Sequence, residues 1–157
     1  MKYQALNDGF DHINIYSRGR TELGRQLSPF YRREFGMPEG VFASLEGYYY
    51  FKKSNGEYED FRDLSGPAAK EFGREMCMKN RSFIIHPATL IQQVAPAVRA
   101  RIMQDPGLRE MLSQSTLPFA HYYNFQGKLI DRSLEDAWLI DTVTAVRQEL
   151  QSAEPAS

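Results

Sequence analysis

An aromatic segment, Phe-Ala-Ser-Leu-Glu-Gly-Tyr-Tyr-Tyr-Phe-Lys-Lys at residues 42–53, is the feature that most constrains the fold. Ser44 has the short hydroxyl side chain that caps helix N-termini, and the spacing of the apolar residues after it predicts an α-helix. Helical geometry groups the side chains into two faces. One face contains Leu45, Tyr48, Tyr49 and Lys52, and the other contains Glu46, Tyr50 and Lys53. The sequence therefore predicts a central helix with a carboxylate in its first turn.

An irregular loop is expected before this helix. Pro29 fixes its own φ angle and disfavours the helical conformation for Ser28, so Phe30 and Tyr31 should project from non-helical chain. Aromatic rings presented in this way can stack on a planar ligand, although burial in a core is the commoner use of such rings. The hydroxyl of Ser28 can bind a ribose or a phosphate, or it can stabilise a turn.

A hairpin is expected to connect the loop to the helix. Residues 36–40, Gly-Met-Pro-Glu-Gly, predict a turn that reverses the chain between strands at 32–35 and 41–43. Such a hairpin would bring Glu46 next to the loop.

The other predicted elements are short, and helices predominate. They are a half-buried strand at 12–17, an exposed connection at 17–26, a solvated linker or short helix at 57–63, a helix at 65–78 packed closely through Gly73, a short apolar stretch at 82–86, a helix at 87–102 kinked or split at Pro96, a helical turn at 106–112 capped by Asp105, a hairpin of 116–125 with 128–131, and an amphipathic helix to Leu150 that starts from a capping box at Ser133. These predict an α+β fold, with a single domain over residues 1–152 and a frayed tail at 153–157.

Composition narrows the class of partner and compartment. The net charge of −1 lacks the basic footprint of a dedicated nucleic-acid binder, although the local cluster Arg18, Arg20, Arg25, Arg32 and Arg33 can hold phosphates. A single cysteine, Cys77, excludes an internal disulfide and indicates a reducing compartment. No membrane span or signal peptide is evident, so the cytoplasm is the expected location.

The loop and the helix start resemble the NADAR or YbiA-like family. Its fingerprint is a Ser-Asn-Phe-type loop, then a Ser-x-Glu helix start with aromatics and a lysine one to two turns later. The matching residues are Ser28-Pro29-Phe30, and Ser44-Leu45-Glu46 through Lys52 and Lys53. The similarity continues in residues 68–74 and 98–112, and the start at 11–17 is similar to that of NADAR-like proteins of bacteriophages. Two departures are Pro29 in place of the usual Asn, and a missing Trp-Gly region whose place is taken by residues 121–125 and Asp131.

This resemblance implies a YbiA-like α+β fold and cleavage of an N-glycosidic bond in an ADP-ribose- or nucleotide-related compound. It implies Glu46 as the catalytic carboxylate, and the substrate-binding residues Ser28, Phe30, Tyr31, Tyr50, Lys53, Tyr122 and Asp131. No cofactor is expected, a nucleic acid is expected only as a modified substrate, and a phage-encoded protein would act in the host cytoplasm.

Two other functions remain open. A non-catalytic protein could sequester an NAD-derived nucleotide, as in phage counter-defence, and a plain interaction domain could use the aromatic residues as its core. An acidic residue in a first helical turn is also favoured by the helix dipole alone, without any catalytic role for Glu46. His12, His86 and His121 lack the spacing and acidic partners of a zinc site, so no metal is predicted.

Overall fold

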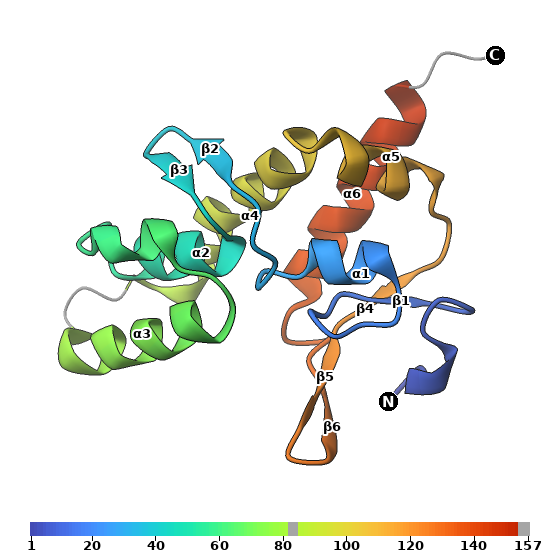
Figure 1. Cartoon of the computed structure of the whole chain (residues 1–157), viewed down its shortest axis with the longest axis horizontal. Helices are drawn as coiled ribbons and strands as arrows, with labels where there is room; N and C mark the ends of the chain where they lie inside the picture. Colours follow the sequence, from blue (N-terminus) through green and yellow to red (C-terminus); the bar gives the residue numbers. More distant parts are fainter. Residues whose placement is uncertain (82–84, 154–157) are drawn as a thin grey trace. The chain divides into compact units, whose positions relative to one another are not determined.

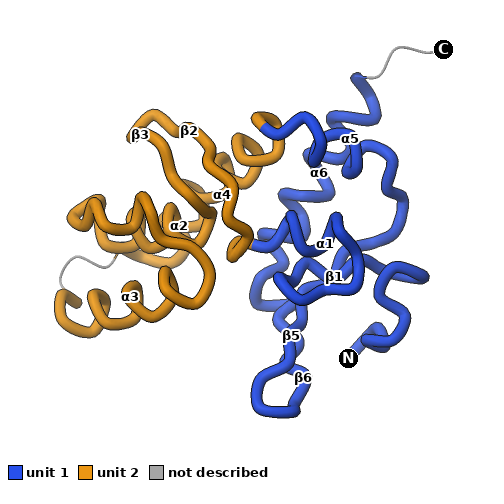
Figure 2. Tube along the Cα trace, in the orientation of Figure 1, with its two compact units in different colours: residues 1–28, 105–157 blue, residues 29–104 orange. Residues whose placement is uncertain are grey.

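A computed structural model describes residues 1–81 and 85–153. The chain forms two compact units, which are Met1–Ser28 with Asp105–Ser157 (unit 1), and Pro29–Gln104 (unit 2) (Figure 2). Most of the predicted apolar stretch at 82–86 and most of the predicted frayed tail lie outside the described residues.

Unit 2 is built around one short helix. Its elements are β2 (Phe35–Met37), β3 (Gly40–Phe42), α2 (Leu45–Lys53), the 3-10 helix η2 (Glu59–Asp63), α3 (Gly66–Lys79) and α4 (Pro87–Met103). Helix α2 packs against η2, α3 and α4 (Figure 1). The predicted central helix is confirmed, and so is the Ser44 cap, whose hydroxyl accepts a hydrogen bond from the Gly47 amide at 3.0 Å.

The predicted hairpin before α2 is confirmed, with its strands displaced along the chain. Strands β2 and β3 pair Phe35 with Phe42 and Met37 with Gly40. Only Pro38 and Glu39 remain unpaired between them, so the strands extend further into the predicted turn than the Gly and Pro content suggests.

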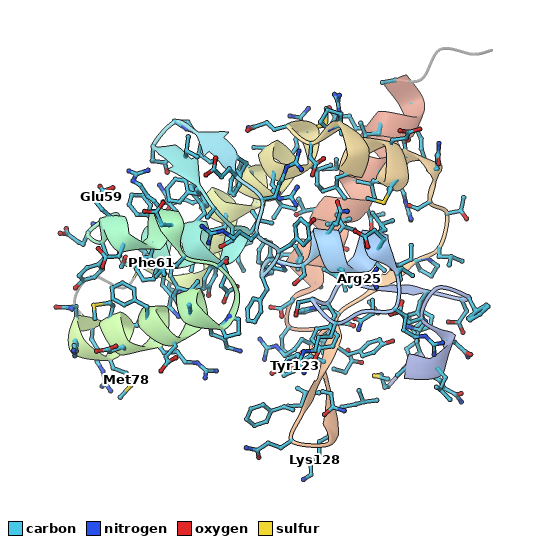
Figure 3. The ribbon with its side chains drawn as sticks, viewed as in Figure 1. Arg25, Glu59, Phe61, Met78, Tyr123 and Lys128 are labelled. Atoms are coloured by element: carbon cyan, nitrogen blue, oxygen red, sulfur yellow. The ribbon has the colours of Figure 1, made fainter. Side chains whose placement is uncertain are left out.

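Aromatic rings form much of the core of unit 2. Phe42 and Phe61 are fully buried, and their rings meet those of Tyr48 and Phe72 edge to face, each at 4.9 Å between centroids. Figure 3 shows Phe61 inside the group of helices and Met78 projecting away from it. Of the two predictions for 57–63, the short helix is confirmed as η2, which is not simply solvated because it carries one core residue between exposed acidic residues.

Helix α4 is one continuous helix. Pro96 lies inside it on the exposed side, so the helix is not split there. Leu90, Val94, Val98 and Ile102 keep the predicted helical spacing and are buried. At its start, the His86 Nδ1 accepts a hydrogen bond from the Ala88 amide at 3.1 Å, which caps the helix.

Unit 1 combines both ends of the described chain. Its elements are η1 (Ala5–Asn7), β1 (Ile13–Asn14), α1 (Glu22–Leu27), α5 (Pro106–Gln114), β4 (Phe119–Ala120), β5 (Tyr122–Phe125), β6 (Lys128–Asp131) and α6 (Ala137–Ala153). Strand β1 pairs in parallel with β4, joining Ile13 to Phe119 and Asn14 to Ala120. The predicted β5–β6 hairpin is confirmed, with Gln126 and Gly127 in left-handed conformations at its turn.

The strand predicted at 12–17 is present but limited to Ile13–Asn14, and the prediction that it is half-buried was wrong, because both of its faces are covered. His12 and Asn14 are as buried as Ile13 and Ile15. The Asn14 side chain accepts from the Tyr122 amide and donates to the Tyr122 carbonyl, both at 2.9 Å. It thus replaces the strand partner that β5 would otherwise need at this point.

Replacing Asn14 by Ala should lower the free energy of unfolding by roughly 2–4 kcal/mol, because both backbone groups of Tyr122 would be left buried without a partner. Asn124→Ala is the matched control, since that exposed side chain accepts one hydrogen bond, from the Gly127 amide. Urea unfolding of both variants measures the difference. Equal losses would contradict a structural role for the Asn14 amide.

Two further local predictions were wrong. Residues 17–26 are not an exposed connection, because α1 forms there with Thr21 as its cap and Leu23 and Leu27 buried. Ser133 does not cap α6, because its hydroxyl accepts from the His121 amide at 3.0 Å and the helix begins at Ala137. In both places a contact with a distant segment overrides the local pattern.

The fold is α+β with helices predominating, as predicted. Strands occur only as three two-stranded pairings within the described residues. No helix among these residues has the length and apolar character that crossing a bilayer requires.

Candidate functional site

Glu46 lies in the first turn of α2, where the loop and the helix meet. Its backbone amide donates to the Pro29 carbonyl at 3.0 Å, so the chain of the loop is attached directly to the helix start. The Ser44 hydroxyl donates to the Leu64 carbonyl at 2.7 Å, which ties the same turn to the segment before α3. The Glu46 side chain is partly buried. The predicted approach of Glu46 to the loop is therefore present in the backbone.

Tyr50 stands one turn after Glu46 and is almost fully buried. A Cβ atom on Gly73 would come within 2.3 Å of the Tyr50 ring, so α3 approaches α2 at a residue that has no side chain. Burial, and then the nearby Glu46 carboxylate, raise the pKa of Tyr50 above its ordinary value. Tyr50 is therefore a neutral phenol at physiological pH, and the Glu46 carboxylate is close enough to influence it.

Each aromatic residue of the loop has a cation on its ring. The Lys70 ammonium lies 6.0 Å from the centre of the Phe30 ring, and the Arg101 guanidinium lies 5.4 Å from that of Tyr31. Both rings remain partly exposed, whereas Arg101 is 2% exposed. The first turn of α3 is also near, since a Cβ on Gly66 would lie 4.0 Å from the Phe30 ring.

Sequence reasoning did not identify Lys70 or Arg101 as part of this cluster. A signal for Arg101 exists, because it occupies a position on α4 where the spacing of Leu90, Val94 and Val98 calls for an apolar residue. A charged residue on an apolar helix face is a candidate for a specific contact. Lys70 carries no such signal, because it follows two alanines on an ordinary amphipathic helix.

The two lysines at the end of α2 have different surroundings. Lys52 forms an ion pair with Glu39 at 3.0 Å, and the Tyr48 hydroxyl donates to the same carboxylate at 2.9 Å. Lys53 instead lies 5.7 Å from the centres of both the Tyr49 and the Tyr50 rings. Lys53 is therefore the lysine that stays near the predicted site, whereas Lys52 is engaged elsewhere.

Ser28 belongs to unit 1, where it ends α1. Its ψ angle of 136° is extended, as expected before Pro29, and the residue is buried. Two arginines of the predicted basic cluster form contacts within the protein. Arg25 pairs with Glu22 at 2.6 Å, and Arg32 donates to the Asp63 carbonyl at 3.0 Å.

Tyr122 and Asp131 also belong to unit 1. The Asp11 carboxylate accepts from His12 Nδ1 at 2.5 Å, which leaves His12 Nε2 to accept from the Tyr122 hydroxyl at 2.6 Å. Burial, and then Asp8 and Asp11, raise the pKa of Tyr122 to about 12. Asp131 is exposed at the end of β6, where it accepts from the Ser133 amide at 2.9 Å. Both residues line a pocket of about 330 Å³.

A second pocket in unit 1, of about 250 Å³, is lined by two other arginines of the N-terminal basic cluster. Arg18 and Arg20 line it together with Tyr16 and Tyr123, whose rings are 6.5 Å apart. The Asp8 carboxylate faces the same space and accepts from the Arg20 amide at 2.8 Å. Glu46, Phe30 and Tyr31 line neither of these two pockets.

His12 and His121 contact other residues of the protein. His12 stacks on Tyr3 at 4.6 Å, and His121 Nδ1 donates to the Ile15 carbonyl at 2.6 Å. Over residues 1–81 and 85–153, no group of three or more His, Cys, Asp or Glu side chains is arranged to hold a metal ion.

Comparison with known proteins identifies the fold. No protein-family model matches the sequence, and no curated protein matches it. The chain is similar in structure to the E. coli protein YbiA, solved by NMR, with a TM-score of 0.68 and 19% sequence identity. The alignment covers 94% of this chain and 90% of that chain. The predominantly helical α+β architecture is thus a YbiA-like fold, as predicted from the resemblance.

Proposed function

We propose that this protein hydrolyses an N-glycosidic bond in an ADP-ribose- or nucleotide-related compound, with Glu46 as the catalytic carboxylate. The observation that carries this proposal is the attachment of the Glu46 amide to the Pro29 carbonyl, which joins the two parts of the fingerprint. The YbiA-like fold supports it further.

Cleavage of a C–N glycosidic bond passes through an oxocarbenium-like state, in which positive charge develops on the sugar. The Glu46 carboxylate would stabilise this charge and orient a water molecule toward the anomeric carbon. The departing base takes the bonding electron pair and needs a proton or a pre-existing positive charge. A buried neutral phenol such as Tyr50 is a suitable neighbour, because it does not add a second negative charge beside Glu46.

The loop would recognise the planar and anionic parts of the substrate. Phe30 and Tyr31 are partly exposed and would stack on a base. Lys53 and Lys70 lie on the rings of this cluster and would bind phosphate oxygens. Ser28, Tyr122 and Asp131 are proposed as further substrate contacts. The cytoplasm, and the host cytoplasm for a phage-encoded protein, is the proposed site of action.

A specific observation favours a second function, sequestration of an NAD-derived nucleotide without catalysis. Pro29 occupies the position of the usual Asn, and what it supplies to the site is a backbone carbonyl already bonded to the Glu46 amide. The side-chain amide of an Asn is therefore missing. A pocket of this kind could retain the ligand and lose turnover.

Thermal unfolding with a panel of NAD, ADP-ribose and an ADP-ribosylated base should show stabilisation by at least one compound. A ligand at about 100 times its dissociation constant adds roughly 2.7 kcal/mol, which raises Tm by about 5–10 °C in a chain of this size. Chromatography of the same mixtures should show release of a free base, unchanged by a chelator. Stabilisation without products would support sequestration, and no stabilisation by any compound would contradict both functions.

A further inference from the structure

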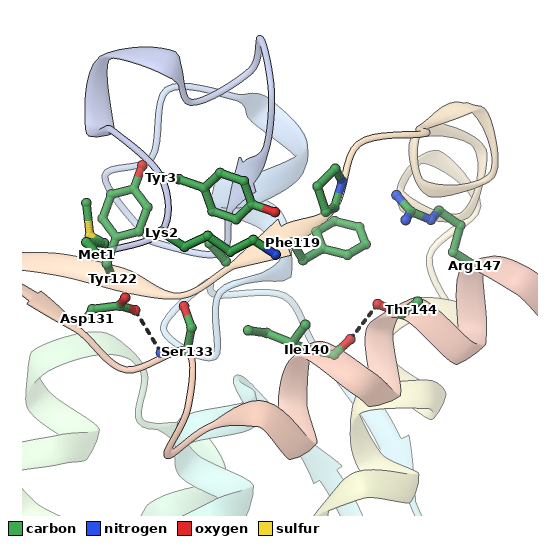
Figure 4. Close-up of a pocket in the computed structure, with 12 residues that line it drawn as sticks. Met1, Lys2, Tyr3, Phe119, Tyr122, Asp131, Ser133, Ile140, Thr144 and Arg147 are labelled. Atoms are coloured by element: carbon green, nitrogen blue, oxygen red, sulfur yellow. Dashed lines mark hydrogen bonds between the residues drawn. The ribbon is translucent and has the colours of Figure 1, made fainter.

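The pocket of about 330 Å³ in unit 1 contains a buried cation. Its walls come mainly from the first residues of the chain, from β4 and the start of β5, and from α6 (Figure 4). Tyr3, Phe119 and Tyr122 supply aromatic rings, and Ile140 supplies an aliphatic surface. Arg147 lies at one end of the pocket, beside the Phe119 ring, and its guanidinium is 4.5 Å from the centre of that ring.

Arg147 has only neutral partners among the residues that the structure describes. Its Nη1 donates to the Ser115 hydroxyl at 3.1 Å and to the Leu117 carbonyl at 2.7 Å. No carboxylate of residues 1–81 or 85–153 pairs with it. Burial lowers the pKa of Arg147 from the ordinary value, but an arginine side chain in a protein stays protonated. A buried charge without a counter-ion is costly, so an anion that reaches the guanidinium is stabilised there.

Donor groups of Arg147 remain available to such an anion. The hydrogen bonds within the described residues use Nη1 alone, which leaves Nε and Nη2. No buried side-chain nitrogen or oxygen among these residues lacks a partner, so Nε and Nη2 are open to solvent. Arg147 is also one of the residues that line the pocket.

Several other polar groups of the walls are already bonded. The Tyr122 hydroxyl donates to His12, the Thr144 hydroxyl donates to the Ile140 carbonyl at 2.8 Å, and Asp131 accepts from Ser133. Figure 4 shows Asp131 at the end of the pocket opposite Arg147, with the Lys2 side chain extending between them. The pocket therefore has the Arg147 charge at one end, the Asp131 carboxylate at the other and Lys2 between them, with aromatic surface from Tyr3, Phe119 and Tyr122.

We propose that this pocket binds a small planar anion of the aromatic carboxylate class, with the carboxylate on Arg147 and the ring against Tyr3 and Phe119. The pocket consists of unit 1 residues and does not include Glu46, although it shares Tyr122 and Asp131 with the substrate contacts proposed above. The present proposal rests on Arg147 and the aromatic walls, and it does not require hydrolysis at Glu46. A bidentate contact of a carboxylate with Nε and Nη2 matches the geometry of the guanidinium.

Proton–nitrogen NMR of the arginine Nε–H groups tests this on the unaltered protein. Benzoate should shift the assigned Arg147 signal in a saturable way, and benzamide, which has the same shape without the charge, should leave it in place. Inorganic phosphate should act more weakly than benzoate, because it gains nothing from the aromatic walls. No saturation by benzoate up to about 20 mM, equal shifts from benzoate and benzamide, or equal affinity for phosphate would each overturn the proposal.

Variants give a second readout. Arg147→Gln should weaken benzoate binding by about tenfold or more, since a charge-assisted pair is lost. Ile140→Trp fills the pocket and keeps the charge, and it should abolish binding even if Arg147→Gln fails to fold. Arg109→Gln on α5 is the matched control and should bind as the wild type does. Unchanged affinity in Ile140→Trp would overturn the proposal.

Discussion

Gly73→Ala is expected to lower the free energy of unfolding by about 2 kcal/mol or more, although Ala is the better helix former. The added Cβ would lie 2.3–2.6 Å from three atoms of the Tyr50 ring. That ring has little room to move, because it is buried and the Phe61 ring stacks on it with 5.9 Å between the ring centres. The strain therefore has to move α2, the helix that carries Glu46, away from α3.

Gly107→Ala is the matched control for this change. Gly107 lies in the first turn of α5, where an added Cβ would be 3.7 Å from the nearest atom, the Asp105 carboxylate oxygen. An ordinary van der Waals contact carries no strain, so the control should be as stable as the wild type or up to about 1 kcal/mol more stable. Chemical denaturation measures both. Equal stability of the two variants would contradict the close packing of Tyr50 on Gly73.

Glu46→Gln is expected to reduce turnover by about a hundredfold or more, which corresponds to roughly 2.7 kcal/mol in the activation barrier. The substitution keeps the shape of the side chain and removes the charge that would stabilise the oxocarbenium-like state. Stability should change by only a few tenths of a kcal/mol, because the charge also complements the positive end of α2. Steady-state kinetics should place the loss in kcat, since the interaction is strongest in the transition state.

Glu71→Gln provides the control for charge removal. Glu71 is exposed on α3 in the same unit, so its loss changes the net charge equally without touching the loop. Its turnover should match that of the wild type. If the Glu46→Gln protein were as active as the Glu71→Gln protein, Glu46 would have no catalytic role and would only complement the dipole of α2.

Local signals explain what the sequence predicted correctly. Ser44 and Asp105 were recognised as helix caps because a cap bonds to amides two or three residues away. The β5–β6 hairpin was recognised for the same reason, since Gln126-Gly127 reverses the chain within its own neighbourhood. The YbiA-like fold was predicted from the family resemblance together with such local signals.

The errors involve partners that are distant in sequence. Strand β1 has only two residues and pairs with β4, more than 100 positions later, so no local pattern shows that Asn14 is buried. Ser133 has a capping sequence, yet its hydroxyl serves His121. The cations on Phe30 and Tyr31 depend on how α3 and α4 pack in unit 2, which single-sequence patterns do not specify.

Hydrolysis in ¹⁸O-labelled water tests the central claim most directly. The wild-type protein is incubated with NAD, ADP-ribose and an ADP-ribosylated base, and the products are weighed by mass spectrometry. The account predicts a free, unlabelled base and one ¹⁸O atom on the sugar at the cleaved bond, with both products strongly reduced in Glu46→Gln. Return of every compound intact, or labelled products that form equally fast in Glu46→Gln, would contradict it.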